Sequence, residues 1–299
     1  MAQTSVKAYG KFNIALNVLG TQNGYHNLDT FVCTVDKYDK IILTSRKDKK
    51  ILVSFSGDYA FTPEDQSTLN AYKAAEKFIE KFNTNGVNIE IIKNIPDGGG
   101  MGGSSTNISG VLNGMKKLYK IDGEVKDIAD CLGSDSGYLL EGGFARLTSR
   151  GEVVEKLDID TELYFVVIHA KTGVNTSKCF KTFDENNFDG EVCDIAEVIS
   201  AVTNNEISAL KGKTLNALTK PASLLNEEVE RNLNKLNELS PIFSSMTGSG
   251  STVFSMYDTV ELATWAVGKL KKEFGSRVEV LKSFDPNKRT FWESLFHKT

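Results

Sequence analysis

Five glycines and three hydroxyl residues form the stretch of this sequence that is best suited to hold a ligand. The glycines fall within residues 98–103, interrupted only by Met101, and Ser104, Ser105 and Thr106 follow directly. Glycine lets the backbone approach a ligand closely, at a conformational cost that such a run must offset. A hydroxyl group at this place can serve a phosphate or Mg²⁺.

A strand is predicted before these glycines and a helix after them. Val87, Ile89 and Ile91 alternate, which indicates a strand over 86–95. Apolar residues then recur at helical spacing, at Ile108, Val111, Leu112, Met115 and Leu118. A helix N-terminus offers free N–H donors and a positive dipole end, which suit a phosphate. Pro96–Thr106 therefore predicts a phosphate-binding loop, and a flexible surface loop with a serine cap is the alternative.

Two other phosphate motifs fit less well. The sequence lacks GxxxxGK[ST], which disfavours a P-loop NTPase. Gly98-x-Gly100-x-x-Gly103 formally matches a dinucleotide fingerprint, but that turn directly follows its strand. Here residues 93–96 intervene and no early βαβ unit is evident. A serine hydrolase is not supported because no GxSxG occurs.

Composition and charge narrow the class of protein. The 299 residues are 40% hydrophobic and 25% charged, which is typical of a globular chain with one large domain or two. A net charge of −4 gives no sign of a nucleic-acid surface. The four cysteines form no CxxC pair, and no apolar run approaches the ~18 residues of a membrane span. We therefore expect a reduced, cytoplasmic protein with no nucleic-acid or membrane partner.

The remaining pattern mixes strands and helices. A soft domain boundary is expected near residue 157, which gives domains 1–157 and 158–299. Further strands are predicted at 5–19, 31–35, 40–44, 51–56, 142–147, 152–157, 163–170, 251–256 and 278–281. Further helices are predicted at 67–82, 124–132, 191–203, 206–218, 224–239 and 260–274.

Three motifs make the chain resemble the GHMP kinases. Gly10–Asn13 is similar to their A-K-x-N, Pro96–Asn107 to their glycine-rich second motif, and Met246–Gly250 to their T-G-S/T-G loop. Between them, Leu132–Asp135 resembles L-G-A-D-V-P. The resemblance implies an α+β, two-lobed GHMP kinase fold. Its N-terminal lobe would be like domain 2 of ribosomal protein S5 and its C-terminal lobe ferredoxin-like, with ATP in the cleft between them.

Within this superfamily, Gly24-Tyr25-His26 matches the G-Y-H of the diphosphocytidyl-methylerythritol kinase family. The resemblance implies that Tyr25 stacks on a cytosine, His26 hydrogen-bonds it, and Phe180 supplies a second stacking ring. A turn tyrosine, a surface histidine and a core phenylalanine are the alternatives. The small-molecule substrate implied is 4-diphosphocytidyl-2-C-methyl-D-erythritol, phosphorylated on its 2-hydroxyl group in non-mevalonate isoprenoid synthesis.

The resemblance also implies a role for each motif residue. Lys11 and Asp135 are the expected catalytic pair. The expected ATP-binding residues are Lys93, beside the adenine, and Pro96, Gly98, Gly99, Gly100, Met101, Gly102, Gly103, Ser104, Ser105 and Thr106. Those expected to bind the substrate are Asn13, Tyr25, His26, Phe180, Thr247 and Gly248. Ser105 is also the expected Mg²⁺ ligand.

The chemistry implied is phosphoryl transfer, which needs positioning and charge stabilisation more than covalent help. Asp135 would accept the proton of the acceptor hydroxyl, a role typically worth about 10²–10⁴-fold. Lys11 would hold Asp135 ionised and stabilise the developing charge.

Departures from the family pattern leave the acceptor open. Ser136-Gly137 follow Asp135 in place of Val-Pro, Met101 replaces Leu, and Leu69-Asn70 is inverted. Ser104 and Thr106 replace a Gly and a Ser. Another GHMP kinase, acting on a mevalonate-type, homoserine or sugar substrate, is the main alternative. A non-enzymatic regulator of this fold would be expected to lose Lys11 or Asp135, and both are present. The sequence does not address the oligomeric state.

Overall fold

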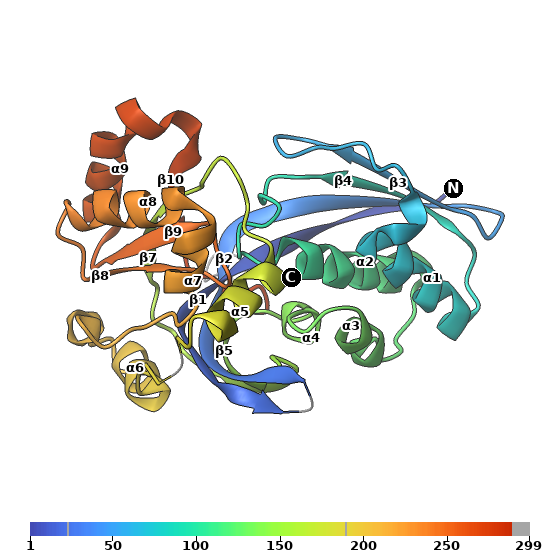
Figure 1. The fold of residues 1–299 in the computed structure, drawn as a ribbon. Coiled ribbons are helices and arrows are strands. Elements are labelled where there is room, and N and C mark those ends of the chain that lie inside the picture. Colours follow the sequence, from blue (N-terminus) through green and yellow to red (C-terminus); the bar gives the residue numbers. More distant parts are fainter. Residues whose placement is uncertain (23, 189, 289–299) are drawn as a thin grey trace, which may run out of the picture.

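Two β-sheets, each covered by helices, make up the chain (Figure 1). The computed structural model describes residues 1–288 except 23 and 189. The first sheet has the order β3-β4-β2-β5-β6, with β1 paired to β2. Its strands are β1 (Gln3–Gln22), β2 (Tyr25–Ser45), β3 (Ile51–Ser56), β4 (Val87–Ile92), β5 (Phe144–Ser149) and β6 (Val153–Leu157).

A long hairpin of β1 and β2 forms the spine of this sheet. Separate strands at 31–35 and 40–44 were predicted, and this was wrong, because β2 runs on through residues 36–39, where Tyr38 and Asp39 pair with Tyr9 and Ala8 of β1. The register shifts between Tyr9 and Lys11 and again between Asn13 and Ala15. Such bulges re-aim side chains beside functional sites.

Four helices cover one face of the first sheet (Figure 1). They are α1 (Asn70–Phe82), α2 (Gly103–Tyr119), α3 (Lys126–Leu132) and α4 (Ser136–Leu139). The apolar stripe predicted for α2 is buried in the core of this lobe with Ile41, Leu43 and Ile89. The packing of this stripe fixes the direction of α2 and therefore the place of its N-terminus.

The second sheet is antiparallel with the order β10-β7-β9-β8. Its strands are β7 (Tyr164–Ile168), β8 (Phe243–Met246), β9 (Val253–Tyr257) and β10 (Val278–Lys282). The accompanying helices are α5 (Thr176–Glu185), α6 (Ile195–Thr203), α7 (Thr219–Leu225), α8 (Glu227–Asn237) and α9 (Val260–Phe274). Across the sheet, its four strands lie in the order fourth, first, third, second, counted along the chain. This is the ferredoxin-like arrangement. The predicted α+β class is therefore confirmed.

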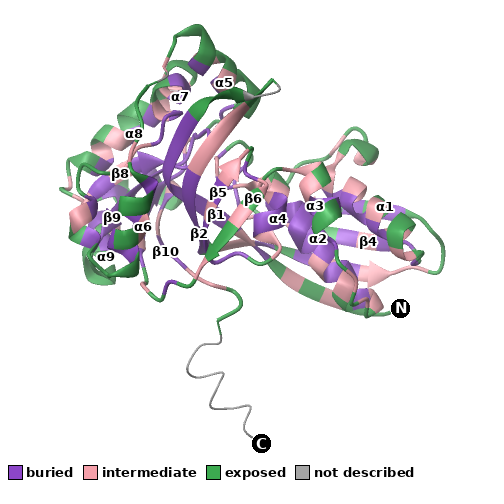
Figure 2. Ribbon diagram, turned by 90° about the horizontal axis from the view of Figure 1, so that it is seen from below, coloured by how far each residue is buried: buried purple, intermediate pink, exposed green. Residues whose placement is uncertain are grey.

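The two lobes share a hydrophobic core. Phe12 of β1 stacks on Phe254 of β9 with ring centroids 4.8 Å apart, and its edge meets Phe165 at 5.2 Å. Figure 2 shows the hairpin buried where it passes between the lobes. We propose that the lobe boundary lies near residue 157, between β6 and β7. Strand β1 nevertheless packs in the cores of both lobes.

The segment 206–218 consists of turns and a single bridge to β1, whereas a helix was predicted. A short 3₁₀ turn covers Ile207–Leu210, and Gly212 then has a positive φ of 74°. Beyond it, Leu16 of β1 donates from its N–H to Leu215 O at 2.8 Å and accepts from Ala217 N at 2.9 Å. These hydrogen bonds with β1 satisfy the backbone groups of Leu215 and Ala217 in place of bonds within a helix. Among the described residues, no helix is long and apolar enough to cross a membrane.

A half-buried carboxylate, that of Glu279, ties the second sheet to β2. Glu279 Oε1 lies 2.6 Å from both Lys37 Nζ and His169 Nε2. Burial alone would raise the pKa of Glu279, but the hydrogen bond from His169 and the Lys37 ammonium together hold it below its usual range. Since the folded pKa is lowered, the stabilisation is present above the unfolded value and is lost as pH falls through the folded one.

Glu279→Gln is expected to lower the free energy of unfolding by about 1.5–3 kcal/mol at neutral pH, because it removes the charge from both hydrogen bonds. The difference from wild type should shrink as pH falls below 4.5, the ordinary glutamate value. Urea unfolding across this pH range measures both effects. Glu238→Gln, at an exposed ion pair with Lys235, is the control. A loss independent of pH would contradict the electrostatic explanation.

Candidate active site

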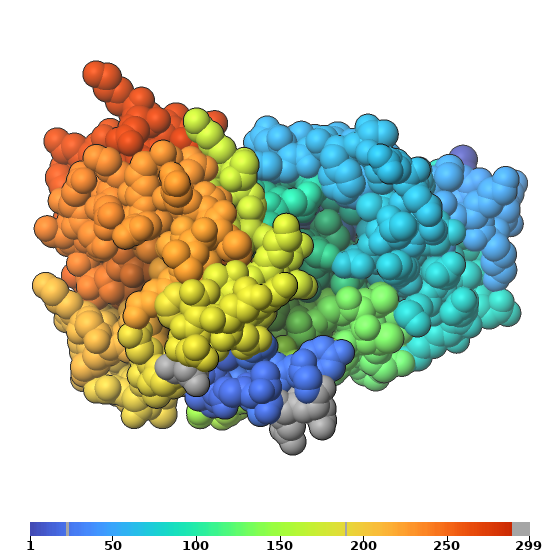
Figure 3. Space-filling model, in the orientation of Figure 1, coloured from blue at the N-terminus to red at the C-terminus, as the bar shows by residue number. Residues whose placement is uncertain are grey.

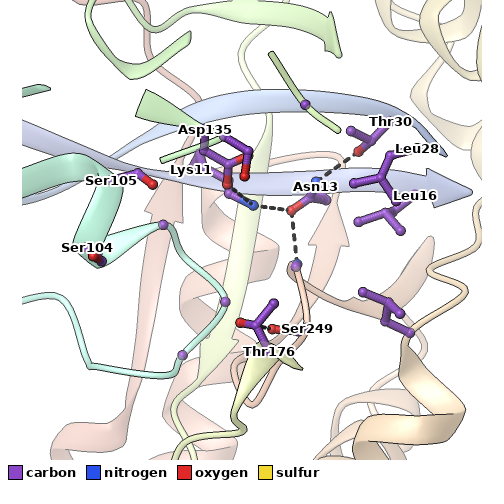
Figure 4. A pocket seen from close by; sticks show the side chains of 18 of the residues that line it. Lys11, Asn13, Leu16, Leu28, Thr30, Ser104, Ser105, Asp135, Thr176 and Ser249 are labelled. Carbon is purple, nitrogen blue, oxygen red and sulfur yellow. Dashed lines mark hydrogen bonds and ion pairs between the residues drawn. The ribbon is translucent and has the colours of Figure 1, made fainter. Parts of the chain in front are cut away.

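A cavity of 290 Å³ lies between the two lobes (Figures 3 and 4). Both lobes line it, since β1, β2 and the glycine loop meet α5 and the loop after β8 there. The polar residues that line it include Lys11, Asn13, Thr30, Ser104, Ser105, Asp135, Arg150 and Thr176. One concave site therefore brings together basic, acidic, hydroxyl and backbone groups.

The glycine loop packs backbone to backbone on the second lobe. Gly98, Gly100 and Gly102 have positive φ values of 62°, 75° and 77°. A Cβ on Gly100 would lie 1.9 Å from Thr247 O, so no side chain fits there. Ser251 N donates to Gly98 O at 3.0 Å, and Thr252 N to Gly99 O at 3.2 Å. The second lobe therefore holds the loop by its carbonyl groups.

The N-terminus of α2 opens into the cavity. No side chain caps it at Gly102, and the N–H groups of its first turn have no partner within the helix. Figure 4 places Ser104 and Ser105 at this end of α2. Free N–H donors together with the positive end of the helix dipole make an anion site. Asn70 Nδ2 donates to Ser104 Oγ and ties α1 to the same turn.

Lys11 and Asp135 meet across the cavity, as predicted from the motifs. Lys11 Nζ lies 3.2 Å from Asp135 Oδ2, and the side chains are 5% and 29% exposed. Asp135 directly precedes α4. A Cβ on Gly137 would lie 2.0 Å from Asp130 Oδ1, so the Ser-Gly departure permits close packing of α4 on α3.

Asn13 joins β1 to the Thr247–Gly250 loop of the second lobe. Its Oδ1 accepts from Lys11 Nζ at 2.5 Å and from Gly248 N at 2.9 Å (Figure 4). Its own N–H donates to Thr247 Oγ1 at 3.1 Å. Thr247 is fully buried and supports the loop from behind, whereas Gly248 lines the cavity.

Four predicted ATP residues lie outside this cavity. Met101 is buried, and Pro96 is buried at the start of the loop. Thr106 donates from its hydroxyl to Tyr9 O at 3.2 Å. Lys93, 1% exposed, lies 2.9 Å from an oxygen of Asp97.

Lys93 also lies 3.5 Å from Asp39 Oδ2. Burial raises the pKa of Asp39, although Lys93 opposes this. Lys93 lines a second cavity of 210 Å³ with Phe55, Phe61 and Ser104. Asn107 faces the same cavity, and its buried Oδ1 has no hydrogen-bond partner within the described part of the chain.

The predicted aromatic residues gather near the turn of the hairpin, where β2 begins. Phe180 lines the first cavity, and His26 stacks on it with ring centroids 4.7 Å apart. His26 Nε2 is 2.7 Å from Asp184 Oδ1. Tyr25 is 53% exposed, and the Arg150 guanidinium lies 3.7 Å from its ring centroid. Neither Tyr25 nor His26 lines the cavity, so Phe180 is the one of the three predicted rings that faces it.

Arg150 and Asp184 are site residues that sequence reasoning missed. Asp184 lies on α5, a helix that was not predicted, although Cys179 and Phe183 give a helical spacing in which both residues are buried. Asn175 caps this helix by accepting from Lys178 N. Arg150 follows β5 in a tight turn that carried no recognised motif. No cluster of three or more His, Cys, Asp or Glu side chains suited to a metal occurs among the residues described.

Comparisons with known proteins agree with this geometry. The GHMP kinases N-terminal domain pattern matches residues 70–145. The chain is 33% identical over 289 residues to 4-diphosphocytidyl-2-C-methyl-D-erythritol kinase of Clostridium perfringens, covering 94% of this chain and 99% of that protein. The protein of that name from Alkaliphilus metalliredigens is 32% identical over 262 residues, covering 86% and 89%.

A solved structure of 4-(cytidine 5'-diphospho)-2C-methyl-D-erythritol kinase is also similar. It matches with a TM-score of 0.78 and 23% identity, covering 94% of this chain and all of that one. This likeness in structure confirms the predicted two-lobed GHMP kinase fold.

Gly100→Ala is expected to destabilise the fold by about 2–5 kcal/mol, because the new methyl group strains the backbone and overlaps Thr247. Affinity for ATP should fall with it, since the loop must shift. Urea unfolding and equilibrium ATP binding measure the two effects.

Gly268→Ala on α9 is the matched control, because nothing lies within 4 Å of its Cβ position. Wild-type stability and ATP affinity in Gly100→Ala would show that the two loops do not touch in this way.

Proposed function

The chain belongs to the 4-diphosphocytidyl-2-C-methyl-D-erythritol kinase family of the GHMP kinases, and from this premise we propose that it phosphorylates the 2-hydroxyl group of that substrate with ATP. The observation that carries the proposal is the placement of Lys11 and Asp135, 3.2 Å apart, in one cavity with the uncapped N-terminus of α2. A phosphate donor site and a proton acceptor are thereby adjacent.

The glycine loop and α2 fit the triphosphate of ATP. The N–H groups of the first turn of α2 supply donors for phosphate oxygens. The second cavity adjoins Ser104 and fits the adenine, because Phe55 and Phe61 offer an apolar wall. The unpartnered Oδ1 of Asn107 can accept from the adenine amino group. Lys93 then lies beside the base and supports the loop through Asp97.

The donor set also fits Mg²⁺. This ion keeps several waters and takes one or two protein oxygens together with substrate phosphates. Ser105 faces the first cavity and would offer such an oxygen. When bound, Mg²⁺ supplies charge neutralisation at the β- and γ-phosphates.

The transfer step uses this chain's own residues as follows. The acceptor oxygen bonds to the γ-phosphorus as the bond from phosphorus to the β,γ-bridging oxygen breaks, and ADP leaves with that electron pair. Asp135 Oδ accepts the hydroxyl proton. Lys11, held by Asn13 and Asp135, keeps one of its three N–H bonds for a phosphoryl oxygen. This arrangement stabilises negative charge where it develops.

The cytidyl end of the substrate fits the contact between the hairpin and α5. His26 is fixed by Asp184 and stacks on Phe180, which faces the cavity. The Arg150 guanidinium covers one face of Tyr25 and also lines the cavity. A cytosine that stacks on Phe180 or Tyr25 must therefore use the opposite face or displace these groups.

Asp135→Asn is expected to lower kcat by about 10²–10⁴-fold, because the amide cannot accept the proton. Affinity for ATP should change little. An ATP-consumption assay with Mg²⁺ on the cytidyl substrate, mevalonate and homoserine measures activity and selectivity, and Asp122→Asn on the exposed surface is the control. Turnover on mevalonate or homoserine alone would contradict the proposed substrate, and full activity in Asp135→Asn would contradict the proposed base.

Asp184→Asn is expected to raise KM for the cytidyl substrate by about 2–5-fold, because it weakens a partly exposed hydrogen bond that orients His26. The kcat value should stay the same, since Asp184 is remote from the transferred group. Steady-state kinetics measures the two constants separately. Glu185→Gln, one residue along α5, is the control, and equal KM values in all three proteins would contradict the role of Asp184.

A further inference from the structure

We propose that Thr30 is a positioning residue that fixes the orientation of the Asn13 amide and, through it, holds Lys11 and the Thr247–Gly250 loop in place. The proposal rests on the proposed kinase function, in which Lys11 stabilises the transferred group. No motif in the sequence identified Thr30, which lies on β2 beside the cavity and is 2% exposed.

Toward Asn13, the hydroxyl of Thr30 can only accept a hydrogen bond. It donates its single proton to Ala15 O at 2.6 Å, so its oxygen is left as an acceptor. Asn13 Nδ2 donates to that oxygen at 2.8 Å. The amide nitrogen of Asn13 must therefore face Thr30.

The opposite side of the Asn13 amide meets two donors. The Lys11 ammonium is 2.5 Å and the Gly248 N–H 2.9 Å from Oδ1 (Figure 4). Both need an acceptor, so a flipped amide would place its NH₂ group against two N–H donors. The Thr30 hydroxyl therefore selects the only orientation that satisfies every partner.

The surroundings make this selection costly to lose. Lys11, Asn13 and Thr30 are 4%, 3% and 2% exposed, so little of each side chain is open to water that could replace a missing partner. An unpaired polar group in such a place costs far more than one in water. The register shift between Asn13 and Ala15 brings the amide of one and the carbonyl of the other onto the same hydroxyl. Loss of that hydroxyl would leave the buried Nδ2 of Asn13 without its acceptor and would loosen the amide that holds Lys11 beside Asp135.

Thr30→Val and Thr30→Ser test the proposal, because valine keeps the shape and removes the hydroxyl, whereas serine keeps the hydroxyl. Thr30→Val is expected to lower kcat by about 10–100-fold, the size of effect that misplacement of a reacting group gives, with little change in KM. Thr30→Ser should recover most of the activity. Thr44→Val, the same change elsewhere on β2, is the control and should leave kcat unchanged.

A double-mutant cycle separates positioning from mere packing. In a Lys11→Ala background, Thr30→Val should cause no further loss of kcat, because the residue it positions is gone. A packing role would instead give the same fold loss in both backgrounds. Wild-type kcat in a folded Thr30→Val, or Thr30→Ser no better than Thr30→Val, would overturn the proposal.

A measurement on the protein without substrate gives an independent answer. In ¹⁵N-labelled wild type and Thr30→Ser, the two side-chain N–H signals of Asn13 should exchange slowly with D₂O. They should exchange faster in Thr30→Val. Fast exchange in wild type overturns the proposal even if the valine variant does not fold. Absence of turnover in wild type would contradict the proposed function instead. The exchange rates of Asn13 would then test the role of Thr30 by themselves.

Discussion

The contact between two backbone loops, one from each lobe, is the constraint on which the site depends. Gly100 approaches Thr247 so closely that a Cβ would overlap the carbonyl oxygen. The carbonyls of Gly98 and Gly99 are held by Ser251 and Thr252. Since the second lobe takes up these acceptors, the loop runs directly into α2 and leaves the N–H donors of the first turn for a ligand. The phosphate site is thus built mainly from backbone, with Lys11 as the cation beside it.

The same contact between the two lobes also positions the reacting side chains. Asn13 links Lys11 on β1 to Gly248 N in the second lobe, and Lys11 links Asn13 to Asp135 before α4. A shift of one lobe relative to the other would therefore move the cation that faces the transferred group. The shared core around Phe12, Phe165 and Phe254 resists such a shift. Core packing directly beside the cavity-lining residues of β1 in this way fixes the geometry of the cavity.

Local signals in the sequence predicted some parts of this site and not others. Glycine density and the helical stripe located the loop and α2, and the resemblance to the GHMP kinases paired Lys11 with Asp135. The continuity of β2, the non-helical path of 206–218 and the contact of Thr30 with Asn13 depend on hydrogen bonds between residues distant in sequence, so no local pattern predicts them. Helix α5 had a readable signal in Cys179 and Phe183, but the partnership of Asp184 with His26 joins residues 158 positions apart.

The most direct test of the central claim is a crystal structure with a non-hydrolysable ATP analogue and the cytidyl substrate bound together. The structure described here predicts the triphosphate at the N–H groups of Gly103–Ser105 and the adenine beside Lys93 and Asn107. It predicts the acceptor hydroxyl within hydrogen-bond reach of Asp135 and about 3–3.5 Å from the γ-phosphorus. A triphosphate bound away from the N-terminus of α2, or an acceptor hydroxyl that points away from Asp135, would contradict the account.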